Sequence, residues 1–448
     1  MMERQRSIKV LMFPWLAHGH ISPFLELAKR LTDRNFQIYF CSTPVNLTSV
    51  KPKLSQKYSS SIKLVELHLP SLPDLPPHYH TTNGLALNLI PTLKKAFDMS
   101  SSSFSTILST IKPDLLIYDF LQPWAPQLAS CMNIPAVNFL SAGASMVSFV
   151  LHSIKYNGDD HDDEFLTTEL HLSDSMEAKF AEMTESSPDE HIDRAVTCLE
   201  RSNSLILIKS FRELEGKYLD YLSLSFAKKV VPIGPLVAQD TNPEDDSMDI
   251  INWLDKKEKS STVFVSFGSE YYLTNEEMEE IAYGLELSKV NFIWVVRFPL
   301  GQKMAVEEAL PKGFLERVGE KGMVVEDWAP QMKILGHSSI GGFVSHCGWS
   351  SLMESLKLGV PIIAMPMQLD QPINAKLVER SGVGLEVKRD KNGRIEREYL
   401  AKVIREIVVE KARQDIEKKA REMSNIITEK GEEEIDNVVE ELAKLCGM

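Results

Sequence analysis

The sequence lacks the glycine-rich signatures of the common nucleotide-binding enzymes. The loop after the first predicted strand reads PWLAHGHISP, with one glycine, Gly19, and two histidines where G-x-G-x-x-G would be expected, and G-x-x-x-x-G-K-[ST] is missing. A dinucleotide-dependent oxidoreductase needs the first motif, and a P-loop kinase or ATPase needs the second, to bring backbone N–H groups against phosphate. Both classes are therefore poorly supported.

Cysteine is scarce, odd in number and scattered, without any C-x-x-C pair. Such usage is typical of reduced thiols in a cytosolic protein and suggests neither zinc nor disulfides. The residues concerned are Cys41, Cys131, Cys198, Cys347 and Cys446.

Long apolar runs and basic runs are also missing. The apolar run near the N-terminus is short and breaks at Pro14, so it predicts a first strand and not a signal peptide. No uninterrupted apolar segment is long enough to span a bilayer, which argues against a membrane anchor and favours a cytoplasmic protein. The formal net charge of −14, without a Lys/Arg run, argues against nucleic acid as a partner, because phosphate contacts need a basic stripe.

The sequence does contain two series of β-branched runs alternating with amphipathic segments. With 448 residues the chain exceeds the size of a single growing core, so two domains are expected. In the first series, IKVLMF, FQIYFCS, SIKLVELHL, DLLIYDF, IPAVNFL, SLILIKS and KVVPIGP predict parallel strands, with helices from His20 and from about Asn83 to Ile111. The polar stretch from Tyr156 to Ser202 predicts loops with helical pieces.

An acidic, proline-containing stretch, AQDTNPEDDSMD, marks a linker at residues 238–249. Beyond it STVFVSFGS, NFIWVVRF, GMVVEDW, GGFVSHC, PIIAMPM and GLEVKR predict a second parallel sheet, and the tail from Glu396 to Leu445 predicts packing helices. The fold class is α/β, with two doubly wound parallel-sheet domains. Ligands of such sheets bind at the carboxyl ends of the strands.

Two residues of the first series are candidates for acid–base chemistry. His20 follows the first strand, where an imidazole near neutrality can act as a general base; the alternative is a helix-capping or structural histidine. Asp119 ends DLLIYD, where a carboxylate can bind the remote imidazole N–H, or alternatively caps the next helix. Spacing in the sequence does not decide between these alternatives.

Two strand ends of the second series are candidates for anion binding. Gly268 and Ser269 form a small-residue turn through which a phosphate can approach the backbone, or a plain tight turn. The run SHCGWSSLMES combines an imidazole with a helix start, where oriented N–H groups can hold a diphosphate without a metal; the alternative is ordinary capping by serine. Its candidate residues are His346, Gly348, Ser350, Ser351 and Glu354.

Three further residues lie where a sugar and a base can be bound. Asp370 and Gln371 follow a strand and can hydrogen-bond sugar hydroxyls, although Asp370 also suits a helix cap. Trp328 can stack on a flat base or fill the core.

The segment from Trp328 to Gln371, with WAPQ, HCGW and DQ, resembles the signature box of plant family 1 UDP-sugar-dependent glycosyltransferases. The early GH and the YD at a strand end extend the resemblance over the whole chain. It implies a GT-B fold of two facing Rossmann-like domains: an acceptor-binding domain at residues 1–237, a UDP-sugar-binding domain at 250–430, and a last helix at 431–448 that packs back on the first domain.

The resemblance also implies a role for each residue. Trp328 stacks on uracil with Ala329 and Gln331 nearby, and Glu354 binds the ribose. His346, Gly348, Ser350, Ser351 and the Gly268–Ser269 turn bind the diphosphate. Trp349, Asp370 and Gln371 bind the sugar, and the final Gln371 is typical of glucose donors. The family commonly has Asn where Ser350 stands, which puts that contact in doubt.

Within the family, LHLPSLPDLPPHYHTTNG, FRELEGKY and SFGSEYY resemble the branch that adds sugar to an existing sugar of a glycoside, as cucurbit enzymes do with triterpenoid mogrosides. Acceptor contacts are then expected from Gly19, Ser141, His78, His80 and Asn83, with Thr81 beside them. The alternative for the residue 78–83 cluster is a solvated loop.

The predicted reaction is an inverting transfer of glucose from UDP-glucose, with His20 as base and Asp119 as its partner, in a monomer without permanent cofactor or metal. A sugar-free aglycone such as a flavonoid is the alternative acceptor. One rival is a metal-dependent enzyme using DDHDD at residues 159–163, although a solvated loop is the commoner fate of such a charge run. A second rival is a non-catalytic nucleotide-sugar-binding protein, which the Ser350 departure favours slightly.

Overall fold

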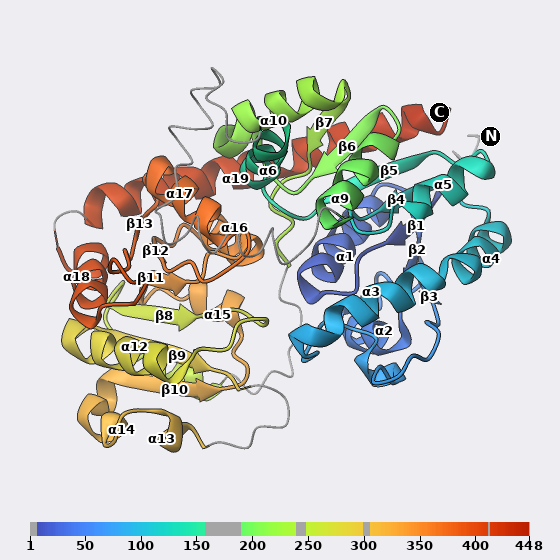
Figure 1. Ribbon diagram of the computed structural model, residues 1–448. Helices are drawn as coiled ribbons and strands as arrows, with labels where there is room; N and C mark the ends of the chain where they lie inside the picture. The colour runs from blue at the N-terminus through green and yellow to red at the C-terminus, as the bar shows by residue number, and fades with distance from the viewer. Residues whose placement is uncertain (1–6, 157–189, 239–247, 299–304, 411–412, 448) are drawn as a thin grey trace. The chain divides into compact units, whose positions relative to one another are not determined.

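The described residues of the computed structural model are 7–156, 190–238, 248–298, 305–410 and 413–447. They fold into two compact units. The first unit contains the chain up to Ala144, residues 190–238 and the chain end from Lys430, and the second contains residues 145–156 and the described residues from Met248 to Glu429. Each unit is built around one parallel sheet (Figure 1).

The first sheet has seven strands among the described residues, in the order β3-β2-β1-β4-β5-β6-β7. In chain order they are β1 (Ile8–Phe13), β2 (Phe36–Ser42), β3 (Ile62–Glu66), β4 (Leu115–Tyr118), β5 (Ala136–Leu140), β6 (Leu205–Ile208) and β7 (Lys229–Pro232). The helical segments are α1 (His18–Thr32), α2 (Pro44–Val50), η1 (Lys51–Lys53), η2 (Pro77–Tyr79), η3 (Leu87–Leu89), α3 (Ile90–Met99), α4 (Ser101–Ile111), α5 (Trp124–Cys131), α9 (Glu190–Arg201) and α10 (Arg212–Phe226).

The second sheet has six strands among the described residues, in the order β10-β9-β8-β11-β12-β13. They are β8 (Thr262–Ser266), β9 (Asn291–Val296), β10 (Gly322–Glu326), β11 (Ile340–Ser345), β12 (Ile362–Ala364) and β13 (Gly384–Glu386). The helical segments are α11 (Met248–Leu254), α12 (Asn275–Ser288), α13 (Val306–Ala309), α14 (Phe314–Val318), η4 (Gly319–Lys321), α15 (Gln331–Leu335), α16 (Trp349–Leu358), α17 (Gln371–Ser381) and α18 (Arg397–Val408). Two helices are divided between the units, α6 (Ala144–Tyr156) and α19 (Arg413–Leu445).

The central strands are buried on both faces because helices cover both sides of each sheet. Successive residues of a strand point to opposite faces, so β1 sends Val10 and Met12 into one core and Leu11 and Phe13 into the other. This is why the sequence shows continuous apolar runs in place of alternation, as predicted for parallel sheets.

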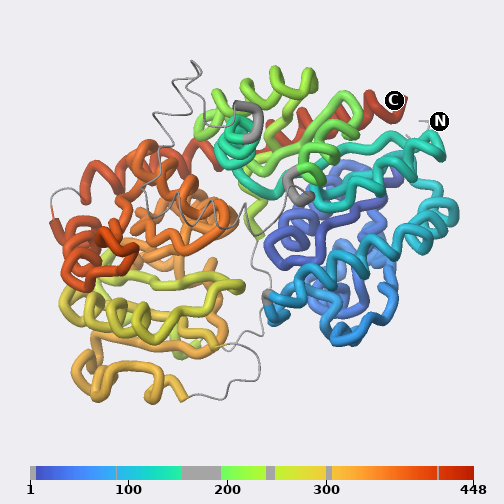
Figure 2. Tube along the Cα trace, viewed as in Figure 1, coloured from blue at the N-terminus to red at the C-terminus, as the bar shows by residue number. Residues whose placement is uncertain are grey.

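Helix α19 contributes to the core of the first unit through its last turns. Ile435, Val438 and Leu442 are buried in the same cluster as Val10 of β1. Each such side chain contributes about 1.5–3 kcal/mol on burial. The chain end then lies against the first unit (Figure 2), where the Cys446 Sγ lies 3.7 Å from the Asp114 carbonyl oxygen.

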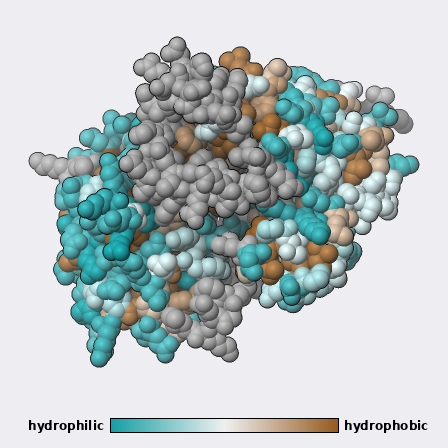
Figure 3. All heavy atoms as spheres, viewed as in Figure 1, coloured by the Kyte–Doolittle hydropathy of each residue, from teal (hydrophilic) through white to brown (hydrophobic). Residues whose placement is uncertain are grey.

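Helices α12 and α18 pack together over the second sheet. Leu400 and Ile404 of α18 are buried in the core, whereas ion pairs such as Arg397 with Glu280 and Arg317 with Glu286 lie toward solvent. The visible face of this unit is accordingly largely hydrophilic (Figure 3). No helix in the described part of the chain combines the length and the apolar character needed to cross a membrane.

The predicted single helix from Asn83 to Ile111 is wrong. Gly84 has a left-handed backbone with φ 71°, the short 3-10 helix η3 follows at Leu87–Leu89, and α3 begins only at Ile90. Helix α3 ends at Met99, and the hydroxyl of its C-cap residue Ser100 donates a 2.6 Å hydrogen bond to the Phe97 carbonyl oxygen and so competes with the continuing helix. The predicted alternation of strands and helices is otherwise confirmed for the described residues. Most of the polar stretch at 156–202 and of the linker at 238–249 lies outside them, at residues 157–189 and 239–247.

Candidate active site

Four of the candidate residues lie at the point in each sheet where the strand order reverses. In the first sheet the reversal falls between β1 and β4, and in the second between β8 and β11. Connections leave such a pair of strands in opposite directions, so the carboxyl ends open a crevice for ligands. His20 and Asp119 follow β1 and β4, and Gly268 and His346 follow β8 and β11.

In the first unit, His20 and Asp119 form a direct pair. The His20 Nδ1 lies 2.8 Å from Oδ2 of Asp119, across 99 residues of sequence. The Asp119 side chain is fully buried, and its carboxylate also accepts the Trp15 N–H at 2.9 Å and the Phe120 N–H at 2.8 Å. The His20 side chain keeps 20% of its surface exposed.

This geometry determines the tautomer of His20. An ionised carboxylate only accepts hydrogen bonds, so the proton of a neutral His20 lies on Nδ1 and Nε2 is left as the basic nitrogen. If Nε2 takes a proton, the buried carboxylate stabilises the resulting imidazolium.

The capping alternatives for these two residues are wrong. The N-cap of α1 is Ala17 and that of α5 is Pro123, so neither His20 nor Asp119 occupies a cap position. The two side chains hydrogen-bond each other instead.

Of the residues predicted to contact the acceptor substrate, Ser141 lies beside His20. It follows β5, and its Oγ is 3.1 Å from the His20 Nδ1. Gly19 is exposed in the first turn of α1, and no atom lies within 4 Å of the position where a Cβ would stand.

The residue 78–83 segment is split between the surface and the interior. His78 and Asn83 are exposed, which fits the solvated-loop alternative, whereas His80 and Thr81 are buried. Burial lowers the pKa of His80. Thr81 donates to the Leu16 carbonyl oxygen, which ties this segment to the loop that precedes α1, the helix of His20.

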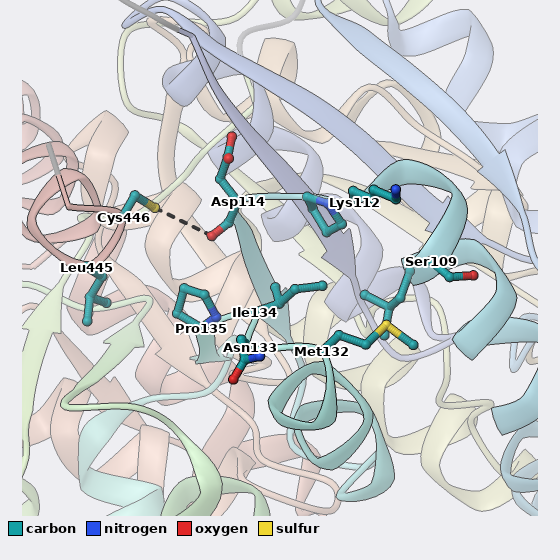
Figure 4. A pocket seen from close by; sticks show the side chains of 11 residues that line it. Ser109, Lys112, Asp114, Met132, Asn133, Ile134, Pro135, Leu445 and Cys446 are labelled. Atoms are coloured by element: carbon teal, nitrogen blue, oxygen red, sulfur yellow. Dashed lines mark hydrogen bonds between the residues drawn. The ribbon is translucent and has the colours of Figure 1, made fainter.

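A cavity of about 640 Å³ in the first unit lies at the amino ends of the strands, opposite the carboxyl ends that His20 and Asp119 follow (Figure 4). Asp114, which lines it, precedes β4, whereas Asp119 follows β4. Cys446 and Lys112 also line this cavity. The cavity is therefore separate from the His20 pair.

In the second unit, the imidazole of His346 lies between two glycines. A Cβ on Gly268 would stand 2.6 Å from the His346 Nε2, and a Cβ on Gly348 would stand 2.4 Å from it. Gly268 has φ +76°, and its carbonyl accepts a hydrogen bond from Arg297 at 3.3 Å. Only glycine at both positions lets the backbone approach the ring this closely.

His346 is neutral at physiological pH. Burial lowers the pKa of His346 to about 4, against a smaller opposing effect of a hydrogen bond to the Ser266 backbone. A neutral ring can donate a hydrogen bond to an anion, but it carries no full positive charge. Positive potential at this edge can come from the helix end and from the guanidinium of Arg297, which donates to the Gly268 carbonyl.

Helix α16 begins directly at this turn and is not capped by serine. Its N-cap is Gly348, no side chain caps it, and the bond from the Leu352 N–H to the Gly348 carbonyl begins its backbone ladder. Ser350 and Ser351 lie within the first turn, so the capping alternative for them is wrong. An uncapped helix start presents N–H groups and the positive end of the dipole.

The residues expected around the base and ribose come from the segment after β10 and from α16. The Gln331 Nε2 donates to Glu354 Oε2 at 2.7 Å and to Ser351 Oγ at 3.1 Å. Trp328 is 63% exposed, so the alternative that it fills the core is wrong, whereas the next residue, Ala329, is buried.

The side chains of Asp370 and Gln371 accept hydrogen bonds from the loop after β12 and from the first turn of α17. Asp370 stands at the N-cap of α17 but makes no capping bond, so the capping alternative is not confirmed. The Gln371 Oε1 accepts the N–H groups of Met367 and Gln368, both at 2.9 Å, which turns its amide NH₂ away from that backbone.

Two residues of this edge have no counterpart among the predicted ones. Asn374 donates to both the Cys347 carbonyl and the Asp370 carboxylate, and Arg297 donates to Gly268. The spacing of Asp370 and Asn374, four residues apart at a predicted helix start, was a usable signal for the first.

No cluster of metal-ligating side chains occurs within the described residues. The DDHDD run at residues 159–163 lies outside them.

The chain matches two family models that together cover almost its whole length. Residues 6–238 match "Glycosyltransferase, N-terminal domain", and residues 190–438 match "UDP-glucoronosyl and UDP-glucosyl transferase". The chain belongs to this UDP-glycosyltransferase family. As a UDP-glycosyltransferase it is an enzyme that transfers a hexose from a UDP-sugar, which confirms the resemblance noted in the sequence.

Relatives of this UDP-glycosyltransferase are similar over nearly their full length. "Mogroside IIIx synthase" of Siraitia grosvenorii is 58% identical over 445 residues, 98% of this chain and 97% of the relative. "Beta-D-glucosyl crocetin beta-1,6-glucosyltransferase" of Gardenia jasminoides is 50% identical, over 97% of this chain and 98% of the relative.

A solved structure, Phytolacca americana UGT2 complexed with UDP-2fluoro-glucose and pterostilbene, is 25% identical. It matches with a TM-score of 0.80, over 99% of this chain and 100% of that one. The predicted GT-B fold is thereby confirmed.

Proposed function

We propose that this enzyme transfers glucose from UDP-glucose to a sugar hydroxyl of a plant glycoside, with inversion at the anomeric carbon. The observation that carries the chemistry is the buried Asp119 carboxylate, 2.8 Å from the His20 Nδ1. The two relatives described above support the acceptor class, because the name of one specifies a glucosylated acceptor and the other makes a mogroside.

The first unit supplies the base. Nε2 of His20 removes the proton from the acceptor hydroxyl, and Asp119 stabilises the imidazolium that forms. The acceptor oxygen then attacks the anomeric carbon, and the bond to the UDP oxygen breaks from the opposite face. Ser141, Gly19 and the residue 78–83 segment are the proposed acceptor contacts, which makes residues 1–237 the acceptor-binding domain.

The second unit holds the donor. Trp328 and Ala329 receive the uracil, and Gln331 and Glu354 receive the ribose. The diphosphate binds at the start of α16 with Gly268, Ser269, His346, Gly348, Ser350 and Ser351. Negative charge that develops on UDP is stabilised by N–H dipoles and the neutral His346, so the leaving group needs no metal. Trp349, Asp370 and Gln371 bind the glucose.

The remaining features of the proposal concern the molecule in the cell. We place it in the cytoplasm because its five cysteines are all free thiols, and we propose that it acts as a monomer. Residues 238–249 serve as the linker, 250–430 as the donor domain and 431–448 as the segment that packs on the first domain.

The deciding experiment measures UDP release with UDP-glucose over a matched panel of glycosides and their aglycones, with the product linkage read by NMR. Release that requires a glycoside supports the proposal, and release with aglycones alone assigns the enzyme to sugar-free acceptors. Full activity in excess EDTA is expected, and loss of activity restored by Mg²⁺ would favour the metal-dependent rival.

A His20→Ala variant tests the base directly. Turnover is expected to fall by roughly 10²-fold to 10⁴-fold, with UDP-glucose binding retained because the donor residues belong to the other unit. Turnover like that of the wild type would end the proposal.

A further inference from the structure

One buried amide connects two of the proposed donor-binding turns. Asn374 of α17 is fully buried, and its Nδ2 donates to the Cys347 carbonyl oxygen at 2.9 Å and to Asp370 Oδ2 at 2.8 Å. Cys347 belongs to the turn after β11 and Asp370 to the loop after β12, and these two strands are neighbours in the sheet. The contact therefore spans the proposed diphosphate and sugar subsites.

Both connected turns contain a residue in an unfavourable backbone conformation. Cys347 has φ 64° and Leu369, immediately before Asp370, has φ 57°. Non-glycine residues in the left-handed region persist where the surrounding structure holds them, and they cluster at functional sites. The Asn374 amide bonds to one of these residues and to the neighbour of the other.

A primary amide satisfies this arrangement, whereas a hydroxyl or a carboxylate does not. Its NH₂ group has two hydrogens, one for the carbonyl and one for the carboxylate, whereas a hydroxyl has a single hydrogen and a carboxylate has none. The reverse orientation would turn Oδ1 toward two acceptors. In the observed orientation Oδ1 accepts no hydrogen bond from the described residues, so the two donated bonds fix the amide.

We propose that Asn374 is a positioning residue for donor recognition: it holds the Asp370 carboxylate against the Cys347 turn, so that the glucose and the diphosphate are bound as one unit. This inference rests on the proposed function, because it assumes that Asp370 binds the donor sugar. Asn374 itself needs no contact with the donor.

The test compares binding of UDP-glucose and of UDP by calorimetry, without acceptor. For Asn374→Ala we expect the Kd of UDP-glucose to rise roughly 10-fold, the size expected for a lost hydrogen bond to a charged group, while the Kd of UDP changes less than about threefold. Equal weakening of both ligands would indicate a merely structural role and overturn the inference.

A double-mutant cycle adds a readout that a general loss of stability does not produce. If Asn374 acts through Asp370, Asn374→Ala adds little to the loss of UDP-glucose affinity already caused by Asp370→Asn. Additive losses would contradict the inference. Should Asn374→Ala fail to fold, the same comparisons are made with Asn374→Ser, which keeps one donor and is expected to show an intermediate loss.

Asn291 provides a matched control in the same sheet. Its Nδ2 also donates to two oxygens, the Ser261 carbonyl and hydroxyl, both at 3.3 Å, but at the amino end of β9. Asn291→Ala is expected to lower the unfolding temperature without changing the ratio of the two dissociation constants. If the wild-type enzyme releases no UDP, the proposed function fails; if it does and the Asn374→Ala ratio is unchanged, only this inference fails.

Discussion

Replacement of Asp119 by Asn tests the His20 pair most sharply. The carboxylate accepts three N–H groups, from His20 and Trp15 at Oδ2 and from Phe120 at Oδ1. An amide has one oxygen, so its NH₂ group must face at least one of these donors. The NH₂ group faces only one of these donors if it points at the Phe120 N–H. In this orientation the oxygen stays toward His20, but the buried Phe120 N–H is left without an acceptor.

Two consequences of different size follow. The unsatisfied N–H is expected to lower the free energy of unfolding by about 1–3 kcal/mol. Loss of the negative charge removes the stabilisation of the imidazolium, which at an effective dielectric constant of about 20 and a charge separation of about 4 Å amounts to at most about 4 kcal/mol. Because His20 is partly exposed, we expect about 2–4 kcal/mol, or a loss of roughly 30-fold to 10³-fold in kcat.

The assay is steady-state UDP release with saturating acceptor, together with the KM for UDP-glucose and a thermal unfolding curve. The matched control is Asp114→Asn, since Asp114 lies at the other end of β4 and accepts the Lys9 N–H at 2.8 Å. It is expected to lose stability and to keep its kcat. A folded Asp119→Asn enzyme with a kcat within threefold of the wild type would refute the role of the pair.

Three further predictions concern burial and close packing. Burial lowers the pKa of His346 to about 4, so the fold favours the neutral ring. The stability that this ring contributes is fully present above about pH 6.5 and is lost as the pH drops toward 4. Urea unfolding of His346→Gln across this range should give a free energy of unfolding that depends less on pH than that of the wild type. Burial and Glu213 raise the pKa of Glu434 to about 8, so stability is lost as the pH rises from about 4.5 to 8. Glu434→Gln should therefore raise the free energy of unfolding at pH 7.5 by about 1–2 kcal/mol. No gain at that pH would refute the burial of this carboxyl. Gly348→Ala places a Cβ 2.4 Å from the His346 Nε2 and should weaken UDP binding roughly 10-fold or more, whereas Gly431→Ala, which meets no atom within 4 Å on α19, should leave binding unchanged in the same titration.

Local sequence patterns determined the elements of this protein. Apolar runs such as LLIY of β4 are buried along their whole length, so they predicted parallel strands. HCGW after an apolar run located the start of α16, and the match of the segment from Trp328 to Gln371 identified the family. These features depend on residues close together in the chain, where periodicity and turn chemistry act.

Only the tertiary structure decided between the alternatives that the sequence left open. His20 and Asp119 lie 99 residues apart, and their pairing depends on β1 and β4 being neighbours at the reversal of the strand order. Burial separated His80 from His78 two residues away, and it made His346 neutral. The link from Asn374 to Cys347 likewise exists because β11 and β12 pair, and pairing of distant strands is a property of the whole sheet that no local pattern encodes.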